Sequence, residues 1–265
     1  MKPFLKWVGG KTQILPDVLK TFPESMQDYH EPFLGGGSVL LEVLQTRKDS
    51  IKGKVYAYDV NEDLINVYID VKEHPKEVHQ YIMQYISEYQ SIQEFKGEKK
   101  PSNKNAGMTS KESYYYWMRN RFNSIEKSIE KSAMLIVMNK LCFRGVYRSG
   151  PNGFNVPFGH PKTTPKMISI QELIDLSKLF KDTEFTCCDF ETSIGNVKKG
   201  DFMYCDPPYV DTFVGYVKDG FTNEQHKKLF KLLRETKGKF VMSNSNTDII
   251  QTEFEKFTID DIECR

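Results

Sequence analysis

The sequence lacks several features that would assign it to a broad class at once. No run of about 18 apolar residues is present, and the first residues are too few and too charged for a signal peptide, so we expect no membrane association. The five cysteines form no CxxC pair and no disulfide-framework spacing, which favours a reducing location, the cytoplasm or the interior of a host cell. They are Cys142, Cys187, Cys188, Cys205 and Cys264. The five histidines are scattered, so no metal site is predicted.

Charge and nucleotide motifs exclude further classes. Lys and Arg number 37 against 36 Asp and Glu, so any basic surface for a nucleic acid must be local. The glycines do not follow the GxGxxG pattern, which disfavours a nicotinamide or flavin cofactor. Gly10-Lys11-Thr12 is similar to the end of a phosphate-binding Walker loop, but Leu5 stands where that loop needs its first glycine.

Three short apolar segments, each preceded by a glycine and ending in polar residues, predict buried strands over 54–59, 201–206 and 239–244. Helical patterns cover 171–180 and 223–235. Thr222 is predicted to cap the second of these helices, with Gln225 completing a capping box. Strands that alternate with helices indicate an α/β fold, a doubly wound parallel sheet with helices on both faces.

The middle of the chain departs from this alternation. Residues 64–143 are mainly helical in pattern, interrupted at 95–111 by a stretch with five lysines and one acid, Glu98. This stretch is either a solvated loop or a loop that contacts a phosphate backbone. The pattern predicts a main α/β domain built from 1–63 and 167–265, with a mostly helical module, 64–166, inserted in it.

A glycine-rich turn is predicted between the first strand and its helix. Glu31-Pro-Phe-Leu-Gly-Gly-Gly-Ser38 precedes an apolar helical run, and glycines there let a ligand approach the backbone. A second strand ends at Asp59, 24 residues after Gly35, where a carboxylate can accept hydrogen bonds from ribose hydroxyls. A plain tight turn is the alternative, and the acid at this spacing makes it less favoured.

Asp206-Pro207-Pro208-Tyr209 directly follows a predicted buried strand. The prolines fix φ and lack N–H groups, so this segment is rigid and offers acceptors. With the Asp206 carboxylate and the Tyr209 ring, it suits a planar group that carries an NH2. The alternative is a strand terminator with an exposed acid.

Five ordered blocks together resemble the Dam-like DNA adenine-N6 methyltransferases, the D12 class of the alpha group. The resemblance extends from Phe4 to about Asn246. The blocks are Phe4-Leu-Lys-Trp-Val-Gly-Gly-Lys11, Glu31-Pro-Phe-Leu-Gly-Gly-Gly-Ser38, Asp59-Val-Asn61, Phe154-Asn-Val-Pro-Phe-Gly159 and Asp206-Pro-Pro-Tyr209. Sequences of this family usually continue beyond the position of Arg265.

The resemblance implies an S-adenosylmethionine-dependent enzyme that methylates N6 of adenine in double-stranded DNA. It makes 1–63 with 167–265 the catalytic and cofactor-binding domain and 64–166 the target-recognition module. The base would leave the duplex, and its amino group would attack the methyl group directly, without a metal. Asp206 and the Pro207 carbonyl would accept hydrogens from N6, and Tyr209 would stack on the base. The implied cofactor contacts are Trp7, Lys11, Glu31, Phe33, Gly35, Gly37, Ser38, Asp59, Asp189, Phe190 and Asp206. For Asp189, a helix N-cap is an open alternative.

Residues 139–166 contain five basic residues and no Asp or Glu, a local basic stripe that is typical of phosphate contacts. The five are Lys140, Arg144, Arg148, Lys162 and Lys166. The resemblance makes Phe143 a wedge beside the extruded base, and Arg148 and Lys6 base-reading residues, with Arg144 and Pro157 also near DNA. GATC-methylating members typically have Asn where this chain has Arg144, so GATC is not assigned. A solvated loop over an aromatic cluster is the alternative, and Phe154 and Phe158 are predicted to be core residues.

Two other functions stay open. One is methylation of another amino group, on cytosine N4, RNA or a protein amide, which Asp206 disfavours. The other is a DNA-binding protein without activity, which the intact Asp206-Pro-Pro-Tyr209 and Lys11 disfavour. No obligate protein partner is implied.

Overall fold

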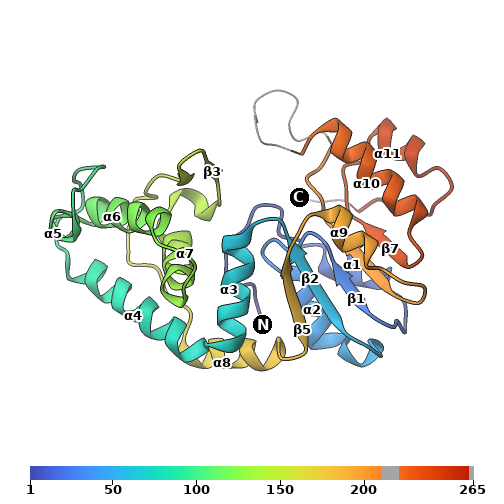
Figure 1. Ribbon diagram of the computed structural model, residues 1–265, viewed down its shortest axis with the longest axis horizontal. Helices are drawn as coiled ribbons and strands as arrows, with labels where there is room; N and C mark the ends of the chain where they lie inside the picture. The colour runs from blue at the N-terminus through green and yellow to red at the C-terminus, as the bar shows by residue number, and fades with distance from the viewer. Residues whose placement is uncertain (211–220, 263–265) are drawn as a thin grey trace. The chain divides into compact units, whose positions relative to one another are not determined.

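The computed structural model describes residues 1–210 and 221–262, and these form two compact units (Figure 1). Unit 1 comprises Met1, residues 11–61 and residues from 182 onward, and unit 2 comprises residues 2–10 and 62–181. No helix in the described part of the chain is long and apolar enough to cross a membrane. Within the described residues, no disulfide joins Cys142, Cys187, Cys188 or Cys205, and Cys264 lies outside those residues.

Unit 1 is an α/β unit with a five-stranded parallel sheet. Its elements are α1 (Leu15–Lys20), β1 (Tyr29–Glu31), α2 (Ser38–Thr46), η1 (Lys48–Ser50), β2 (Val55–Asp59), β5 (Thr183–Cys187), α9 (Phe190–Gly195), β6 (Phe202–Cys205), α10 (Asn223–Glu235), β7 (Lys239–Met242) and α11 (Asp248–Glu253). The strand order is β5-β2-β1-β6-β7, so the chain winds outward from β1 in both directions. This is the doubly wound Rossmann-like order, which confirms the predicted fold class.

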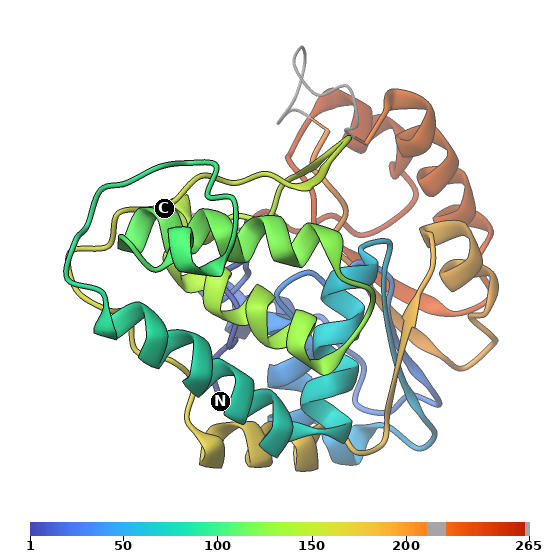
Figure 2. The same cartoon turned by 60° about the vertical axis from the view of Figure 1, so that its left-hand side comes forward.

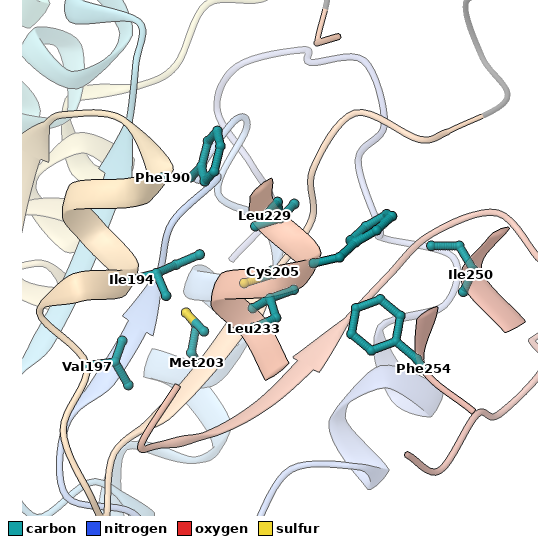
Figure 3. Close-up of a cluster of buried hydrophobic side chains, with 10 residues drawn as sticks. Phe190, Ile194, Val197, Met203, Cys205, Leu229, Leu233, Ile250 and Phe254 are labelled. Atoms are coloured by element: carbon teal, nitrogen blue, oxygen red, sulfur yellow. The ribbon is translucent and has the colours of Figure 1, made fainter. Parts of the chain in front are cut away.

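The sheet is covered on both faces, with α1 and α2 on one and α9 and α10 on the other (Figure 1). Strand β6 shows why, because its four residues are all buried and their side chains alternate between the faces. Phe202 and Tyr204 pack against Phe22 on one face, with ring centroids 4.6 and 5.8 Å away. Met203 and Cys205 join the apolar cluster formed with α9, α10 and α11 on the other (Figure 3).

The predicted strand and helix positions agree with the structure within about two residues. The strands at 54–59, 201–206 and 239–244 are β2, β6 and β7, and the helix at 223–235 is α10 with the predicted bounds. Thr222 caps α10, and Gln225 completes the capping box, as predicted. The turn residues and the apolar periodicity were therefore sufficient to locate these elements.

Unit 2 is mostly helical, and α4, α6 and α7 pack together within it (Figure 2). Its elements are α3 (Glu62–Glu73), α4 (Pro75–Ser91), α5 (Lys104–Gly107), α6 (Lys111–Ser124), α7 (Ile129–Leu141), η2 (Phe143–Gly145), β3 (Ser149–Gly150), β4 (Gly153–Phe154) and α8 (Ile170–Leu179). In the polar stretch at 95–111, Lys104 pairs with Glu88 at 2.7 Å, and Lys111 lies over the Tyr89 ring. These two lysines thus contact the protein itself.

The observed units differ from the expected domain boundaries at two places. Helix α8 belongs to unit 2, because Leu173 and Leu176 are buried among α3 and α4, and Ser177 donates to the Lys72 carbonyl at 2.6 Å. Residues 2–10 also belong to unit 2, because the Asn139 side chain accepts from the Lys6 N–H and donates to the Lys6 carbonyl, each at 2.8 Å. An insertion read from the chain alone could not reveal this pairing of distant segments.

Candidate active site

The candidate site lies in unit 1 at the carboxyl ends of β1 and β6, the central pair of the sheet. These strands are adjacent, and the helices that follow them, α2 and α10, cover opposite faces. A crevice forms at such a switch point because the two connections diverge, and ligands of doubly wound proteins bind there. The glycine turn follows β1, and Asp206 follows β6 directly. The fold thus places the two predicted motifs at neighbouring strand ends.

The glycine turn is held to the end of β2 by backbone and carboxylate contacts. Gly35 and Gly37 have φ values of 49° and 65°, the left-handed region in which a side chain would be strained. The Gly35 N–H donates to Asp59 Oδ2 at 3.0 Å, and the Asn61 N–H donates to Asp59 Oδ1 at 2.9 Å. Burial raises the pKa of Asp59, while these amide bonds act in the opposite direction. Asp59 therefore shapes the turn through both of its carboxylate oxygens.

An ion pair joins the start of unit 1 to the segment after β6. Lys11 Nζ donates to Asp206 Oδ2 at 2.6 Å, and the Lys11 side chain is only 7% exposed. The Lys11 N–H also donates to Ser38 Oγ at 3.2 Å, and Nζ lies 5.0 Å from the centroid of the Tyr209 ring. Lys11 thereby connects the first residue of α2 with both ends of the Asp206–Tyr209 segment.

The second carboxylate oxygen of Asp206 is available. Among residues 1–210 and 221–262, no group donates a hydrogen bond to Asp206 Oδ1, although this atom is buried. Burial raises the pKa of Asp206 to about 6, and the Lys11 charge and hydrogen bond hold it from rising further. Burial lowers the pKa of Lys11, but Asp206 outweighs it, so that the Lys11 pKa is raised overall. Both groups are therefore charged at neutral pH, and Oδ1 is an unused acceptor.

Glu31, at the end of β1, is a second buried carboxyl at the site. Tyr29 lies two residues earlier on the same face of the strand, and its Oη donates to Glu31 Oε2 at 2.8 Å. Burial raises the pKa of Glu31 to about 8; the Tyr29 hydrogen bond lowers it, and the charge of Asp206 raises it. Glu31 is consequently a neutral acid at pH 7, and Asp206 carries the negative charge.

Asp189 and Phe190, two of the implied cofactor contacts, stand at the start of α9. Asp189 Oδ1 accepts from the Thr192 N–H at 2.8 Å, so the alternative of a helix N-cap is confirmed. Phe190 is buried and stacks on Phe33 at a centroid distance of 6.0 Å. Phe33 thus belongs to the glycine turn and also packs on α9.

Trp7 and Lys6 lie in unit 2, whereas Lys11 lies in unit 1. The Trp7 ring stacks on Tyr147, with centroids 5.5 Å apart and planes 24° apart. One sequence block, Phe4 to Lys11, is therefore divided between the units.

The basic stripe surrounds the small hairpin of unit 2. Phe143 is 49% exposed, and its N–H donates to the Pro157 carbonyl at 2.9 Å. Arg144 has a φ of 56°, and its guanidinium lies 5.2 Å from the Phe143 ring. Arg148 Nε donates to Asn155 Oδ1 at 2.6 Å across the hairpin. Arg144, Arg148, Lys162 and Lys166 are exposed, whereas Phe154 and Phe158 are core residues, as predicted.

A doubly wound parallel sheet with these two motifs at its switch point defines the class of Rossmann-like methyltransferases. Residues 7–264 match the model of a protein family described as D12 class N6 adenine-specific DNA methyltransferase. The chain belongs to this family of adenine-specific DNA methyltransferases, which generally use S-adenosylmethionine.

Named relatives extend over most of the chain. The Type II methyltransferase M.MjaIII of Methanocaldococcus jannaschii is 35% identical, over 98% of this chain and 90% of its own length. A DNA adenine methylase of Haemophilus influenzae is 30% identical, over 93% of this chain and 80% of its own length. The Type II methyltransferase M.CviBI of Paramecium bursaria Chlorella virus NC1A is 29% identical, over 97% of this chain and 90% of its own length.

Sequence reasoning missed two features of the site. The Tyr29–Glu31 bond has a sequence signal, because residues two apart on a strand share a face. His226, which contacts the Pro208 carbonyl at 2.8 Å, was not selected. Its signal is its position on the apolar face of α10, where Leu229, Phe230 and Leu233 are also buried. A polar residue on such a face requires a partner.

Proposed function

We propose that this chain transfers a methyl group from S-adenosylmethionine to N6 of an adenine in double-stranded DNA, after the base has left the duplex. The observation that carries the proposal is the buried and unused Asp206 Oδ1, at the switch point of the sheet. Inside a protein an acceptor of this kind is costly unless a ligand satisfies it. An exocyclic NH2 is a donor of matching chemistry.

The residues around the site fit the cofactor. S-adenosylmethionine, when bound, supplies an electrophilic methyl group that the adenine N6 attacks in line. Gly35 and Gly37 leave the backbone of the turn open to close approach. Asp59 offers acceptors for ribose hydroxyls, while Phe33 and Phe190 provide apolar ring faces. The further proposed contacts are Trp7, Lys11, Glu31, Ser38, Asp189 and Asp206.

The Asp206 carboxylate has two tasks in this proposal. It accepts a hydrogen bond from N6, together with the Pro207 carbonyl, which localises the lone pair of the nitrogen. The bond strengthens as N6 becomes positive, so it lowers the barrier more than it strengthens substrate binding. After methyl transfer, N6 carries one proton too many, and a carboxylate with a pKa of about 6 can take that proton and release it to water.

Recognition of DNA would belong to unit 2. Exposed Phe143 is suited to fill the gap that the extruded base leaves, and Arg148 to read guanine in the major groove. Lys6, Arg144 and Pro157 would contribute further contacts, and Lys162 and Lys166 would contact phosphates.

The test is methyl transfer from isotopically labelled cofactor to duplex DNA, followed by mass analysis of the nucleosides. We expect N6-methyladenine, and an Asp206→Asn variant that folds and binds DNA but methylates slower by orders of magnitude, because its amide has one acceptor and no charge. N4-methylcytosine, or a product only with RNA, would overturn the proposal. An Asp206→Asn variant with the wild-type single-turnover rate at saturating cofactor would remove the carboxylate from the mechanism.

A further inference from the structure

His226 is a buried titratable residue that the proposed chemistry does not use. It lies in the first turn of α10, is 6% exposed, and packs edge-on against Phe221 with ring centroids 4.7 Å apart. The centroid of the Phe230 ring lies 5.9 Å from that of His226. An imidazole in such apolar surroundings requires hydrogen-bond partners, and the identity of these partners shows what it holds.

Both ring nitrogens of His226 face backbone carbonyls. Nε2 lies 2.8 Å from the Pro208 carbonyl oxygen, and Nδ1 lies 3.1 Å from that of Thr222. The Thr222 carbonyl already accepts the His226 N–H at 2.9 Å within the helix, so it has a donor without the ring. Within residues 1–210 and 221–262 the Pro208 carbonyl has no other donor, so a hydrogen on Nε2 satisfies an acceptor that is otherwise unpaired. The bond to Pro208 is therefore the one that depends on the side chain.

The Pro208 carbonyl belongs to a segment that its neighbours hold at three points. Asp206 is bound by Lys11 at its start, and the Val210 N–H donates to Asn244 Oδ1 at 3.1 Å at its end. Between these points, Pro207 and Pro208 have no N–H group with which to fix themselves. His226 supplies the middle contact from outside the segment.

The direction of the Pro208 carbonyl determines that of the Pro207 carbonyl. The angle between these two carbonyls depends on φ and ψ of Pro208; the proline ring fixes φ, so a contact that holds the Pro208 carbonyl fixes ψ, the remaining freedom. In extended and polyproline conformations, successive carbonyls point in different directions, about a third to half a turn apart. A donor on α10 that holds the Pro208 carbonyl thus keeps the Pro207 carbonyl pointing in a different direction from the Pro208 carbonyl. Within residues 1–210 and 221–262, nothing donates to Pro207.

We propose that His226 is a positioning residue for the methyl-transfer step. Its Nε2–H fixes the Pro208 carbonyl and thereby orients the Pro207 carbonyl toward the amino group of the target adenine. The inference rests on the proposed function, since it assigns a supporting residue to the same site. The hydrogen-bond and ring partners of His226 in the described part of the chain do not include a proposed S-adenosylmethionine contact, so its effect is expected on the rate of transfer.

Two amide variants test the contact while both retain a polar side chain. In His226→Gln, the amide nitrogen can reach the position of Nε2, whereas in His226→Asn it reaches only that of Nδ1, toward Thr222. His226→Leu removes both contacts. Phe230→Leu is the matched control, because it weakens packing against the His226 ring from the next turn of α10 while it leaves the contacts of both ring nitrogens in place.

Single-turnover methylation is measured at saturating cofactor and DNA, with cofactor affinity measured by calorimetry. His226→Asn and His226→Leu should be slower by roughly tenfold, the rate equivalent of one lost hydrogen bond, with cofactor affinity unchanged. His226→Gln should recover most of the rate. Phe230→Leu should lower the melting temperature but not the rate. In the wild type, the nitrogen NMR spectrum of His226 should show the hydrogen on Nε2.

The outcomes separate this inference from the proposed function. A wild-type protein that forms no N6-methyladenine overturns both. An active wild type with His226→Gln as slow as His226→Asn overturns only the role of His226. The same holds if His226→Leu transfers methyl groups at the wild-type rate, or if Phe230→Leu slows transfer as much as His226→Asn.

Discussion

Replacing Lys11 with methionine should move the acid limb of the methyl-transfer pH profile upward. Methionine keeps most of the apolar length of lysine but removes the charge that lies 2.6 Å from Asp206 Oδ2. Only the ionised carboxylate offers both oxygens as acceptors and a negative charge that stabilises N6 as it becomes positive. Its pKa is about 6 with Lys11 in place, because burial raises it and the ammonium group opposes that rise. Without the ammonium group, burial still raises the pKa of Asp206, and the opposing effect of Lys11 is gone.

The size of the change follows from the contact. An opposite charge at this distance lowers a carboxyl pKa by about 1 to 3 units, so the limb should move upward by that amount. At pH 7, wild-type Asp206 is mostly ionised, whereas in Lys11→Met it is half or more protonated. Transfer by the variant should therefore be slow at neutral pH and recover as the pH rises toward about 9, at about tenfold in ionised fraction per pH unit.

The assay is single-turnover methylation at saturating cofactor across this pH range. Lys20→Met is the matched control, since Lys20 pairs with Asp17 at 2.7 Å on the exposed surface. Its profile should coincide with that of the wild type. If Lys11→Met loses activity equally at all pH values, or keeps a limb near pH 6, then Lys11 does not set the charge state of Asp206.

Three further predictions address the cofactor turn, the buried acid and the DNA contacts. Asp59→Ala should weaken S-adenosylmethionine binding by about 1.5–3 kcal/mol, measured by calorimetry, because a charged acceptor is lost; unchanged affinity would refute the ribose contact. Glu31→Gln replaces a neutral acid by a neutral amide. The pKa of Glu31 is raised in the fold from 4.5 to about 8, so its contribution to stability is complete below 4.5 and is lost as the pH rises through 8. The wild type should therefore lose unfolding free energy relative to Glu31→Gln across that window, by up to ~1.4 kcal/mol per pH unit. If the unfolding free energies of the two proteins, measured in urea, change with pH in the same way, the prediction is contradicted. Arg148→Ala should cost ~1–3 kcal/mol on cognate DNA and relax selectivity at one base, whereas Lys162→Ala should weaken all sequences alike and reduce the salt dependence. Equal losses on cognate and scrambled DNA for Arg148→Ala would make it a phosphate contact.

The parts of the site that the sequence predicted are those fixed by local chemistry. Gly35 and Gly37 take the positive φ that a tight turn requires, and Asp59 ends its strand as the apolar pattern indicated. Thr222 caps its helix as predicted, and Asp189 takes the cap that was its alternative interpretation, because both short side chains reach the N–H three residues on. Such interactions span only a few residues, so their signal is contained in one segment.

The parts that the sequence could not supply depend on burial and on distant partners. The raised pKa of Glu31 follows from its complete burial, which no short pattern encodes. The contact between His226 and Pro208 joins residues 18 apart in sequence. The grouping of residues 2–10 with unit 2 depends on Asn139, more than 130 positions away from Lys6. Apolar periodicity carries no information about which remote segment supplies a partner.

That last contact has a consequence for protein engineering. Because Asn139 binds both the N–H and the carbonyl of Lys6, unit 2 consists of two pieces of chain, 2–10 and 62–181. A chimera that grafts only the internal piece from a relative would leave the N-terminal piece facing a foreign surface. The buried side chain of Asn139 would then face an N-terminal piece from a different parent. Exchange of unit 2 between relatives should therefore succeed when both pieces come from the same parent, with the seams at Gly10–Lys11, Asn61–Glu62 and Lys181–Asp182.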